Sequence, residues 1–242
     1  LETAIENGYC SLPNVELWPL VDDDIISLSN GEFKVKAADE VIFDRIKALV
    51  ERCKRFYDPR QRLWDRPTMF SVPSSDTAAE LTNALKLAGL PAEKVTQETP
   101  RLKRSSIFES VIHQSIALVQ IDVVSEGVDL PIRRLIDIRP TMSPVRWVQQ
   151  IGRIMRPSNE PPEYICCCRN LERHCYLMEG LFPDSKVKEA QEMFDDETHT
   201  IEQFKQRFSK RSGTRAIGLE GLGKFVVTPV QLLNGLTVFT YN

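Results

Sequence analysis

Short apolar runs alternate with helical patterns through the middle of the chain. The runs predict strands at Thr68–Val72, Ile116–Ile121, Arg134–Ile138 and Tyr164–Cys168. Apolar residues at three-to-four spacing predict amphipathic helices over Asp76–Ala88, Arg101–His113 and Pro144–Met155. Strands that alternate with helices of this length indicate a parallel sheet covered by helices on both faces. The predicted fold is therefore α/β, and we place its core at residues 66–168.

Residues 1–65, ahead of this core, have a weaker pattern. They read as a linker with one strand near residues 15–20. A helix is predicted over residues 37–57, where apolar side chains recur at helical spacing until Asp58-Pro59 stops it.

Residues 169–242 form a C-terminal appendage, which we expect to be rich in helix. Helices are predicted at 185–194 and 200–209, and a strand at 224–227. No run approaches the roughly 18 consecutive apolar residues of a membrane-spanning helix, and the N-terminus has no secretory pattern. We therefore expect a cytoplasmic protein that has no membrane partner.

Charge is unevenly distributed, although the net charge is only −3. Residues 130–157 contain no lysine and a single acid, Asp137. The same segment holds six arginines, namely Arg133, Arg134, Arg139, Arg146, Arg153 and Arg156. A guanidinium group matches phosphate oxygens with two parallel donors, so this composition favours a phosphate-containing ligand.

The helix predicted from Pro144 has two unlike faces. Gln149, Arg153 and Arg156 share one face with Gly152 beside them, and apolar residues occupy the other. Gly152 costs about 1 kcal/mol of helix propensity relative to Ala, which suggests that a ligand approaches the backbone there. The two arginines could clamp the charge that develops on a transferred phosphoryl group. The alternative is an arginine-rich helix that makes surface salt bridges.

A glycine flanked by carboxylates follows the second predicted core strand, in the segment Ser125–Pro131. Open α/β sheets bind ligands at the carboxyl ends of their strands, so this segment is a candidate binding loop. The alternative is a simple strand-to-helix turn.

Three segments together resemble the second RecA-like domain of superfamily 2 helicases. Gln149-x-x-Gly152-Arg153-x-x-Arg156 resembles motif VI of that family, and Ser125–Pro131 resembles motif V. Pro67–Val72, with the helix that follows it, is similar to motif IV. The resemblance covers roughly residues 66–157 and implies a RecA-like sheet flanked by helices.

The resemblance implies a role for each motif VI residue. Arg153 and Arg156 would be the catalytic arginine fingers, which reach the γ-phosphate of an ATP molecule held by the first RecA-like domain. Gln149 and Gly152 would contact the same ATP.

The resemblance also implies roles in motifs V and IV. Gly127 and Asp129 would bind the nucleotide and couple it to the bound strand. Ser71 and Ser125 would contact the nucleic-acid backbone. DEAD-box RNA helicases usually have Thr where this chain has Ile121 and Arg where it has Glu126. The sequence is closer here to DNA-directed members such as UvrB-like and restriction-motor helicases, which favours DNA over RNA.

Two ATP-binding elements are missing from the sequence. It contains no Gly-x-x-x-x-Gly-Lys-[Ser/Thr] loop and no magnesium-binding Asp-Glu-x-His box. The segment Ala4–Tyr9 resembles the end of an upstream RecA-like domain. That domain would bind most of the ATP and Mg²⁺, and this chain alone would be inactive. We predict the C-terminal motor domain of an ATP-dependent DNA helicase or translocase. The alternatives are a non-enzymatic nucleic-acid-binding module and a degenerate RecA-like scaffold.

A cluster of thiols raises the question of zinc. Cys166, Cys168, His174 and Cys175 supply enough ligands for a tetrahedral site. In an extended strand, however, Cys167 points away from its two neighbours, and no second CxxC pair is present. We favour a buried strand with reduced thiols and assign no metal ligand.

Overall fold

The core of the computed structural model is a six-stranded sheet in the order β1-β10-β9-β6-β8-β7, in which every pairing is parallel. The structure describes residues 7–121, 130–175, 227–231 and 237–241. The strands of the sheet are β1 (Asn14–Leu17), β6 (Thr68–Ser71), β7 (Ala92–Val95), β8 (Ala117–Gln120), β9 (Arg134–Asp137) and β10 (Glu163–Cys166).

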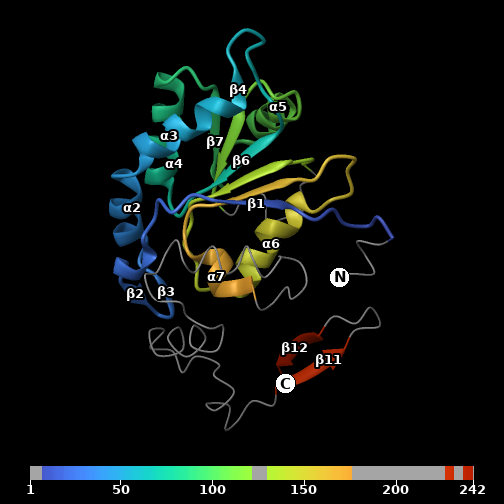
Figure 1. The fold of residues 1–242 in the computed structure, drawn as a ribbon. Helices are drawn as coiled ribbons and strands as arrows, with labels where there is room; N and C mark the ends of the chain where they lie inside the picture. Colours follow the sequence, from blue (N-terminus) through green and yellow to red (C-terminus); the bar gives the residue numbers. More distant parts are fainter. Residues whose placement is uncertain (1–6, 122–129, 176–226, 232–236, 242) are drawn as a thin grey trace.

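Helices cover both faces of the sheet (Figure 1), so the predicted α/β class is confirmed. The helices of one face are α2 (Val35–Phe43), α3 (Ile46–Cys53) and α4 (Ser75–Leu87). The helices of the other face are α5 (Arg101–Ile112), α6 (Pro144–Ile154) and α7 (Asn170–His174). The result is a three-layer arrangement with one apolar cluster on each side of the sheet.

The strands are hydrophobic because the two apolar clusters bury both of their faces. In β6, Phe70 packs into the cluster under α2–α4, and its neighbour Met69 packs into the cluster under α5–α7. Alternate side chains of a strand point to opposite faces, so a doubly covered strand reads as a continuous apolar run.

Local sequence signals begin the helices where the structure has them. The Ser74 hydroxyl accepts a hydrogen bond from the Thr77 N–H at the start of α4. The Ser143 hydroxyl does the same for the Arg146 N–H at the start of α6, where Pro144 is the first helical residue. Both are N-caps that satisfy an amide without a partner inside the helix.

Several elements differ from the sequence-based expectation. The helix expected over residues 37–57 is divided into α2, α3 and a 3-10 turn, Lys54–Phe56. Strand β7 was not predicted, because its sequence AEKV alternates polar and apolar residues weakly. Strand β1 confirms the strand expected near residues 15–20, but its place in the main sheet beside β10 was not predicted.

Smaller elements complete the described part of the chain. Three antiparallel pairs are present, together with a 3-10 turn at Asp23–Ile25. The pairs join β2 (Leu28–Ser29) to β3 (Glu32–Phe33), β4 (Tyr57–Asp58) to β5 (Leu63–Trp64), and β11 (Val227–Gln231) to β12 (Thr237–Tyr241). The helices predicted at 185–194 and 200–209 lie outside the described residues. Within the described residues, every helix is too short or too polar to cross a bilayer.

Candidate functional site

Helix α6 presents a polar surface over an apolar one, as its sequence predicts. Gln149 and Gly152 are exposed and Arg153 is half-buried. Trp147, Ile151 and Ile154 are fully buried on the side that faces the sheet. The buried side packs α6 against the sheet, and Gln149 and Gly152 lie on its opposite, exposed side.

Gly152 has no packing reason to be glycine. Among the described residues, a Cβ atom placed there would meet no heavy atom within 4 Å. This part of the chain therefore leaves space beside the α6 backbone, which fits a group that approaches the helix closely.

Arg156 lies beyond the end of α6, in contrast to the expected helical face. The helix ends at Ile154, with Met155 as its C-cap. Pro157 disfavours the helical conformation at the residue before it, which explains why the helix stops before Arg156. Gln149 and Arg153 are thus positioned by the helix, whereas Arg156 is positioned by the turn that follows.

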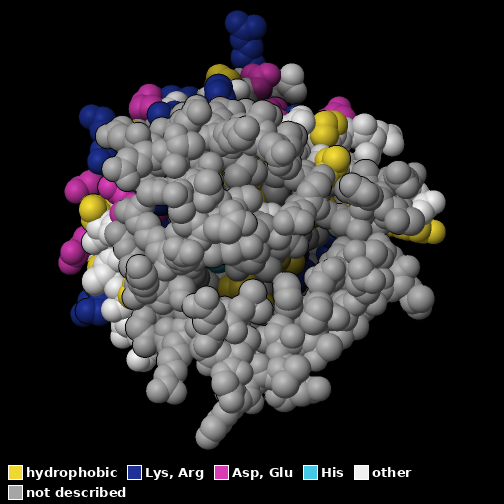
Figure 2. All heavy atoms as spheres, turned by 60° about the horizontal axis from the view of Figure 1, so that its bottom comes forward, with side chains coloured by type: hydrophobic (Ala, Val, Ile, Leu, Met, Phe, Trp, Pro, Cys, Tyr) yellow, Lys and Arg dark blue, Asp and Glu magenta, His cyan; other side chains and the backbone are white. Residues whose placement is uncertain are grey.

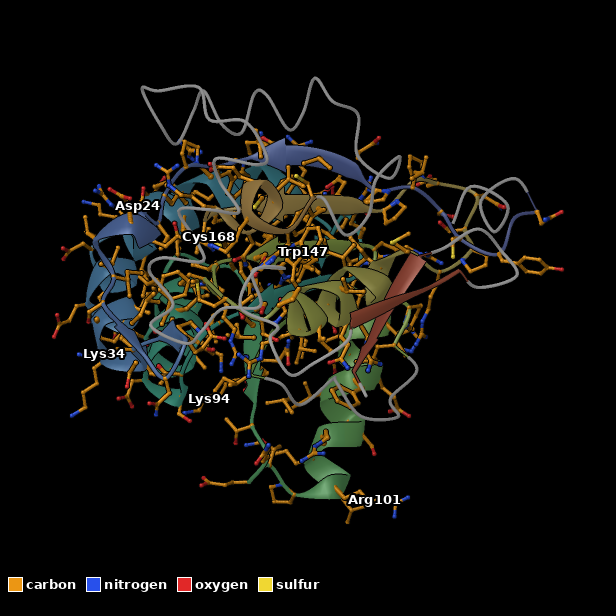
Figure 3. The ribbon with its side chains drawn as sticks, turned by 90° about the horizontal axis from the view of Figure 1, so that it is seen from below. Asp24, Lys34, Lys94, Arg101, Trp147 and Cys168 are labelled. Carbon is orange, nitrogen blue, oxygen red and sulfur yellow. The ribbon has the colours of Figure 1, made fainter. Side chains whose placement is uncertain are left out.

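A buried chain of hydrogen bonds ties α6 to the sheet. The Trp147 indole N–H donates to the Tyr164 hydroxyl at 2.9 Å, and that hydroxyl donates to Asp137 Oδ2 at 3.0 Å. The Asn170 amide donates to the same Oδ2 at 2.9 Å. Figure 3 shows Trp147 well inside the view, whereas Asp24, Lys34 and Arg101 lie at its margin.

Asp137 is an acid in a fully buried position. Burial raises its pKa to about 6, although the hydrogen bonds from Asn170 and Tyr164 and the positive charge of Arg139 act in the opposite direction. The partners of its Oδ2 are neutral, so the carboxylate is costly to ionise.

The six arginines of residues 130–157 divide into different environments. Arg134 is buried and paired with Asp65 and Glu163. Arg146 pairs with Glu32 at 3.0 Å, and Arg139 is buried. Burial or ion pairing holds these three in the fold. Arg133 is described below, and the roles expected of Arg153 and Arg156 stay predictions.

Arg133 was not singled out by the sequence, yet it contacts the backbone beside Arg156. Its guanidinium donates to the Arg156 carbonyl at 3.1 Å and to the Pro157 carbonyl at 3.3 Å. Ser11 contacts the same turn from a distant part of the chain. Contacts to backbone carbonyls leave no sequence signature, because any residue supplies the carbonyl.

The residues of motifs IV and V lie partly in β6 and partly outside the described residues. Ser71 ends β6 and is fully buried, and its hydroxyl has no hydrogen-bond partner in the part of the chain that the structure describes. Gly127, Asp129 and Ser125 lie outside the described residues. Their roles stay predictions.

The thiols do not converge on a common point. Cys166 packs under α5–α7, whereas Cys167 and Cys168 pack under α2–α4. Cys168 leaves the face expected for it because β10 ends at Cys166. The His174 Nε2 faces the Thr141 carbonyl at 2.9 Å. No group of three or more metal-ligating side chains occurs among the described residues.

Figure 2 shows one face of the molecule, on which part of the described surface can be seen. Where described residues are visible along the left margin, on the side of α2 in Figure 1, acidic and basic side chains are intermixed. The margin therefore offers no surface of a single charge.

The part of the chain that contains the central strands and α6 matches a known protein family. Residues 48–158, just under half of the chain, match the family described as helicase conserved C-terminal domain. Over these residues the chain is similar to helicase C-terminal domains. Residues 48–158 contain the elements from β6 to α6 and the Gln-x-x-Gly-Arg-x-x-Arg segment. No match was found among curated proteins.

Solved structures with a similar fold include several helicase C-terminal domains. Domain 2 of the Mss116p DEAD-box helicase, bound to an RNA duplex, is 22% identical with a TM-score of 0.44, covering 60% of this chain and 56% of that one. The C-terminal domain of the DEAD-box protein Dbp5 is 13% identical with a TM-score of 0.45, covering 83% and 98%. An HsdR fragment of a type I restriction enzyme from Vibrio vulnificus YJ016 is 13% identical with a TM-score of 0.47, covering 67% and 33%. At these TM-scores the likeness carries no conclusion about function.

Proposed function

We propose that this helicase C-terminal domain is the second motor domain of an ATP-dependent DNA helicase or translocase of superfamily 2. The observation that carries the proposal is α6, which presents Gln149, Gly152 and Arg153 on its outer side and has Arg156 in the turn after it. In this proposal residues 1–65 lead in from an upstream RecA-like domain, and residues 66–168 form the second motor domain. Residues 169–242 are an appendage.

Arg153 and Arg156 supply positive charge to the phosphoryl group that is transferred from ATP. A preorganised guanidinium stabilises the charge that develops in the transition state and needs no proton transfer. The upstream domain holds most of the nucleotide and its Mg²⁺ ion, which neutralises charge on the phosphates. The fit of a nucleotide to α6 is supported by the open space at Gly152.

DNA is the proposed nucleic acid. The support is the Glu-Gly-Val-Asp sequence at residues 126–129, which resembles the DNA-directed branch of the superfamily. RNA is the alternative. DNA and RNA can each be tested as an activator of ATP hydrolysis in the same assay.

The first test measures DNA-stimulated ATP hydrolysis by the complete protein, including the upstream domain, as wild type and as Arg153→Ala. The kcat should fall by about 10³-fold or more, because an arginine finger contributes on that order to phosphoryl transfer. Binding of DNA and of ATP should be nearly unchanged. Lys54→Ala is the control, since it removes a positive charge from an exposed ion pair with Glu51. A wild type without ATPase, or an unchanged Arg153→Ala rate, would favour the nucleic-acid-binding module instead.

Gly152→Ala provides a second test in which activity and stability move in opposite directions. Alanine should stabilise an exposed helical position by roughly 0.5 to 1 kcal/mol, and the open space at Gly152 admits its methyl group. If a nucleotide lies against this backbone, ATP hydrolysis should nevertheless fall, with a raised KM for ATP. Chemical denaturation and steady-state kinetics on the same protein check both signs. A more stable protein with an unchanged KM contradicts the proposed contact.

A further inference from the structure

The turn that follows α6, residues 155–158, is held by groups that lie far from it in the sequence. We refer to residues 155–158 as the finger turn, because it contains Arg156. The Ser11 N–H donates to the Met155 carbonyl at 2.8 Å. The Ser158 N–H donates to the Ser11 hydroxyl oxygen at 3.1 Å. From the other side, Arg133 donates to the carbonyls of Arg156 and Pro157.

These contacts hold backbone that lies beyond the helix. The carbonyls of Arg156 and Pro157 follow Ile154, the last residue of α6, so the hydrogen bonds of the helix do not include them. A cation is also favourable at this end, where the helix dipole is negative. Since α6 ends at Ile154, its hydrogen-bond ladder does not fix the backbone of Arg156. Ser11 and Arg133 therefore help to fix the backbone on both sides of Arg156.

The two donors are themselves anchored in the sheet. Arg133 immediately precedes β9, and its own N–H donates to the Pro67 carbonyl at 2.9 Å. Ser11 precedes β1, whose first residue, Asn14, donates its N–H to the Pro162 carbonyl at 2.7 Å. The finger turn is thus held between the starts of two strands at the amino edge of the sheet.

We propose that Ser11 and Arg133 are positioning residues that hold the Arg156 side chain in its reactive place. The inference rests on the proposed function, because it assigns the purpose of these contacts to ATP hydrolysis. Ser11 belongs to the segment that enters the domain from its upstream side. A displacement of that segment moves the finger turn directly, which couples the path of the chain between the two motor domains to the geometry of Arg156.

The test measures kcat and KM for ATP in the complete protein for Arg133→Ala, Arg133→Lys and Ser11→Ala. Arg133→Ala should lower kcat by about 10- to 100-fold with little change in KM, because small misplacements of a catalytic group cost on this order. Arg133→Lys should recover part of the loss, since an ammonium group can still donate to one carbonyl. Ser11→Ala should have a smaller effect, because the backbone N–H bond to Met155 remains.

A matched control comes from the same neighbourhood. Arg66 also donates to a backbone carbonyl, that of Pro161 at 3.4 Å, and pairs with Glu163 at 3.2 Å. It contacts a residue outside the finger turn, so Arg66→Ala should leave kcat within about threefold of the wild type. An equal loss of kcat in Arg66→Ala and Arg133→Ala would overturn the inference.

A double-mutant cycle separates positioning from general structural damage. If Arg133 acts through Arg156, the change Arg133→Ala should cost nothing further in protein that already carries Arg156→Ala. Additive losses in the double variant would overturn the inference and leave the proposed function intact. A wild-type rate in Arg156→Ala itself would instead remove the role proposed for that arginine.

Discussion

The two ends of strand β9 bury opposite charges in different ways. At the amino end, Arg134 is only 1% exposed, and it pairs with Asp65 at 2.5 Å and Glu163 at 2.6 Å. At the carboxyl end, Asp137 is fully buried and its Oδ2 accepts hydrogen bonds from the neutral groups of Tyr164 and Asn170. The buried charge of Arg134 is compensated by two carboxylates, whereas Oδ2 of Asp137 is compensated by the dipoles of neutral hydrogen-bond donors.

This difference separates a buried ion pair from a buried group whose ionisation depends on pH. The two carboxylate partners of Arg134 keep contact with solvent, with side chains 46% and 26% exposed. Asp137 instead meets the cost of burial whenever it ionises. The four-residue strand β9 therefore contains an ion-paired arginine, Arg134, and a titrating aspartate, Asp137. The following variants should distinguish their contributions to stability.

Arg134→Ala should have the largest effect on folding. The side chain bridges two acids and lies with its guanidinium carbon 3.5 Å from the centre of the Phe56 ring. Its loss removes the cation paired with Asp65, leaves Glu163 with Arg66 alone, and opens a cavity above the ring. The free energy of unfolding should therefore fall by about 3 to 5 kcal/mol. Urea denaturation measures the change. Arg134→Lys keeps the charge but loses the planar guanidinium group. Its free energy of unfolding should lie between those of the wild type and Arg134→Ala.

Asp137→Asn should change the pH dependence of stability. With a pKa of 3.8 in the unfolded chain and about 6 in the folded protein, the folded state binds more protons between these values. Stability therefore falls as pH rises from about 4 to 6, by up to about 3 kcal/mol for this group, and the loss is complete above 6.

An asparagine at position 137 keeps an oxygen that can accept from Tyr164 and Asn170, and it does not titrate. The variant should therefore lose less stability than the wild type between pH 4 and pH 7. Denaturation curves at several pH values for both proteins give the difference, in which the contributions of all other groups cancel. Parallel curves would mean that Asp137 does not titrate as its burial indicates.

The sequence predicted the strands of this sheet more reliably than the contacts at their ends. The apolar runs at β6, β8, β9 and β10 identified strands because burial on both faces requires them to be hydrophobic throughout. Strand β7 was missed because Glu93 and Lys94 interrupt its apolar residues. An edge strand tolerates such residues, since one side of it has no neighbouring strand.

In the candidate site, too, the positions along the helix could be predicted from the sequence, whereas the contacts beyond its end could not. The exposed positions of Gln149 and Gly152 follow from helical periodicity alone. The end of α6 before Arg156 depends on Pro157, a local signal that the periodicity argument passed over. The contacts of Ser11 and Arg133 could not be predicted, because they join residues separated by 147 and 23 positions through backbone atoms.

Arg55→Ala should have the smallest effect, although Arg55 lies against the same aromatic ring as Arg134. Its guanidinium carbon is 4.6 Å from the centre of the Phe56 ring, and it pairs with Glu16, but half of its side chain is exposed. Solvent screens this pair, so its loss should cost less than about 1 kcal/mol and should diminish further in 1 M salt. The Arg134→Ala loss should change little with salt, because that guanidinium is buried. Equal losses for the two variants would show that contact with Phe56, rather than burial of the ion pair, determines the contribution of each arginine.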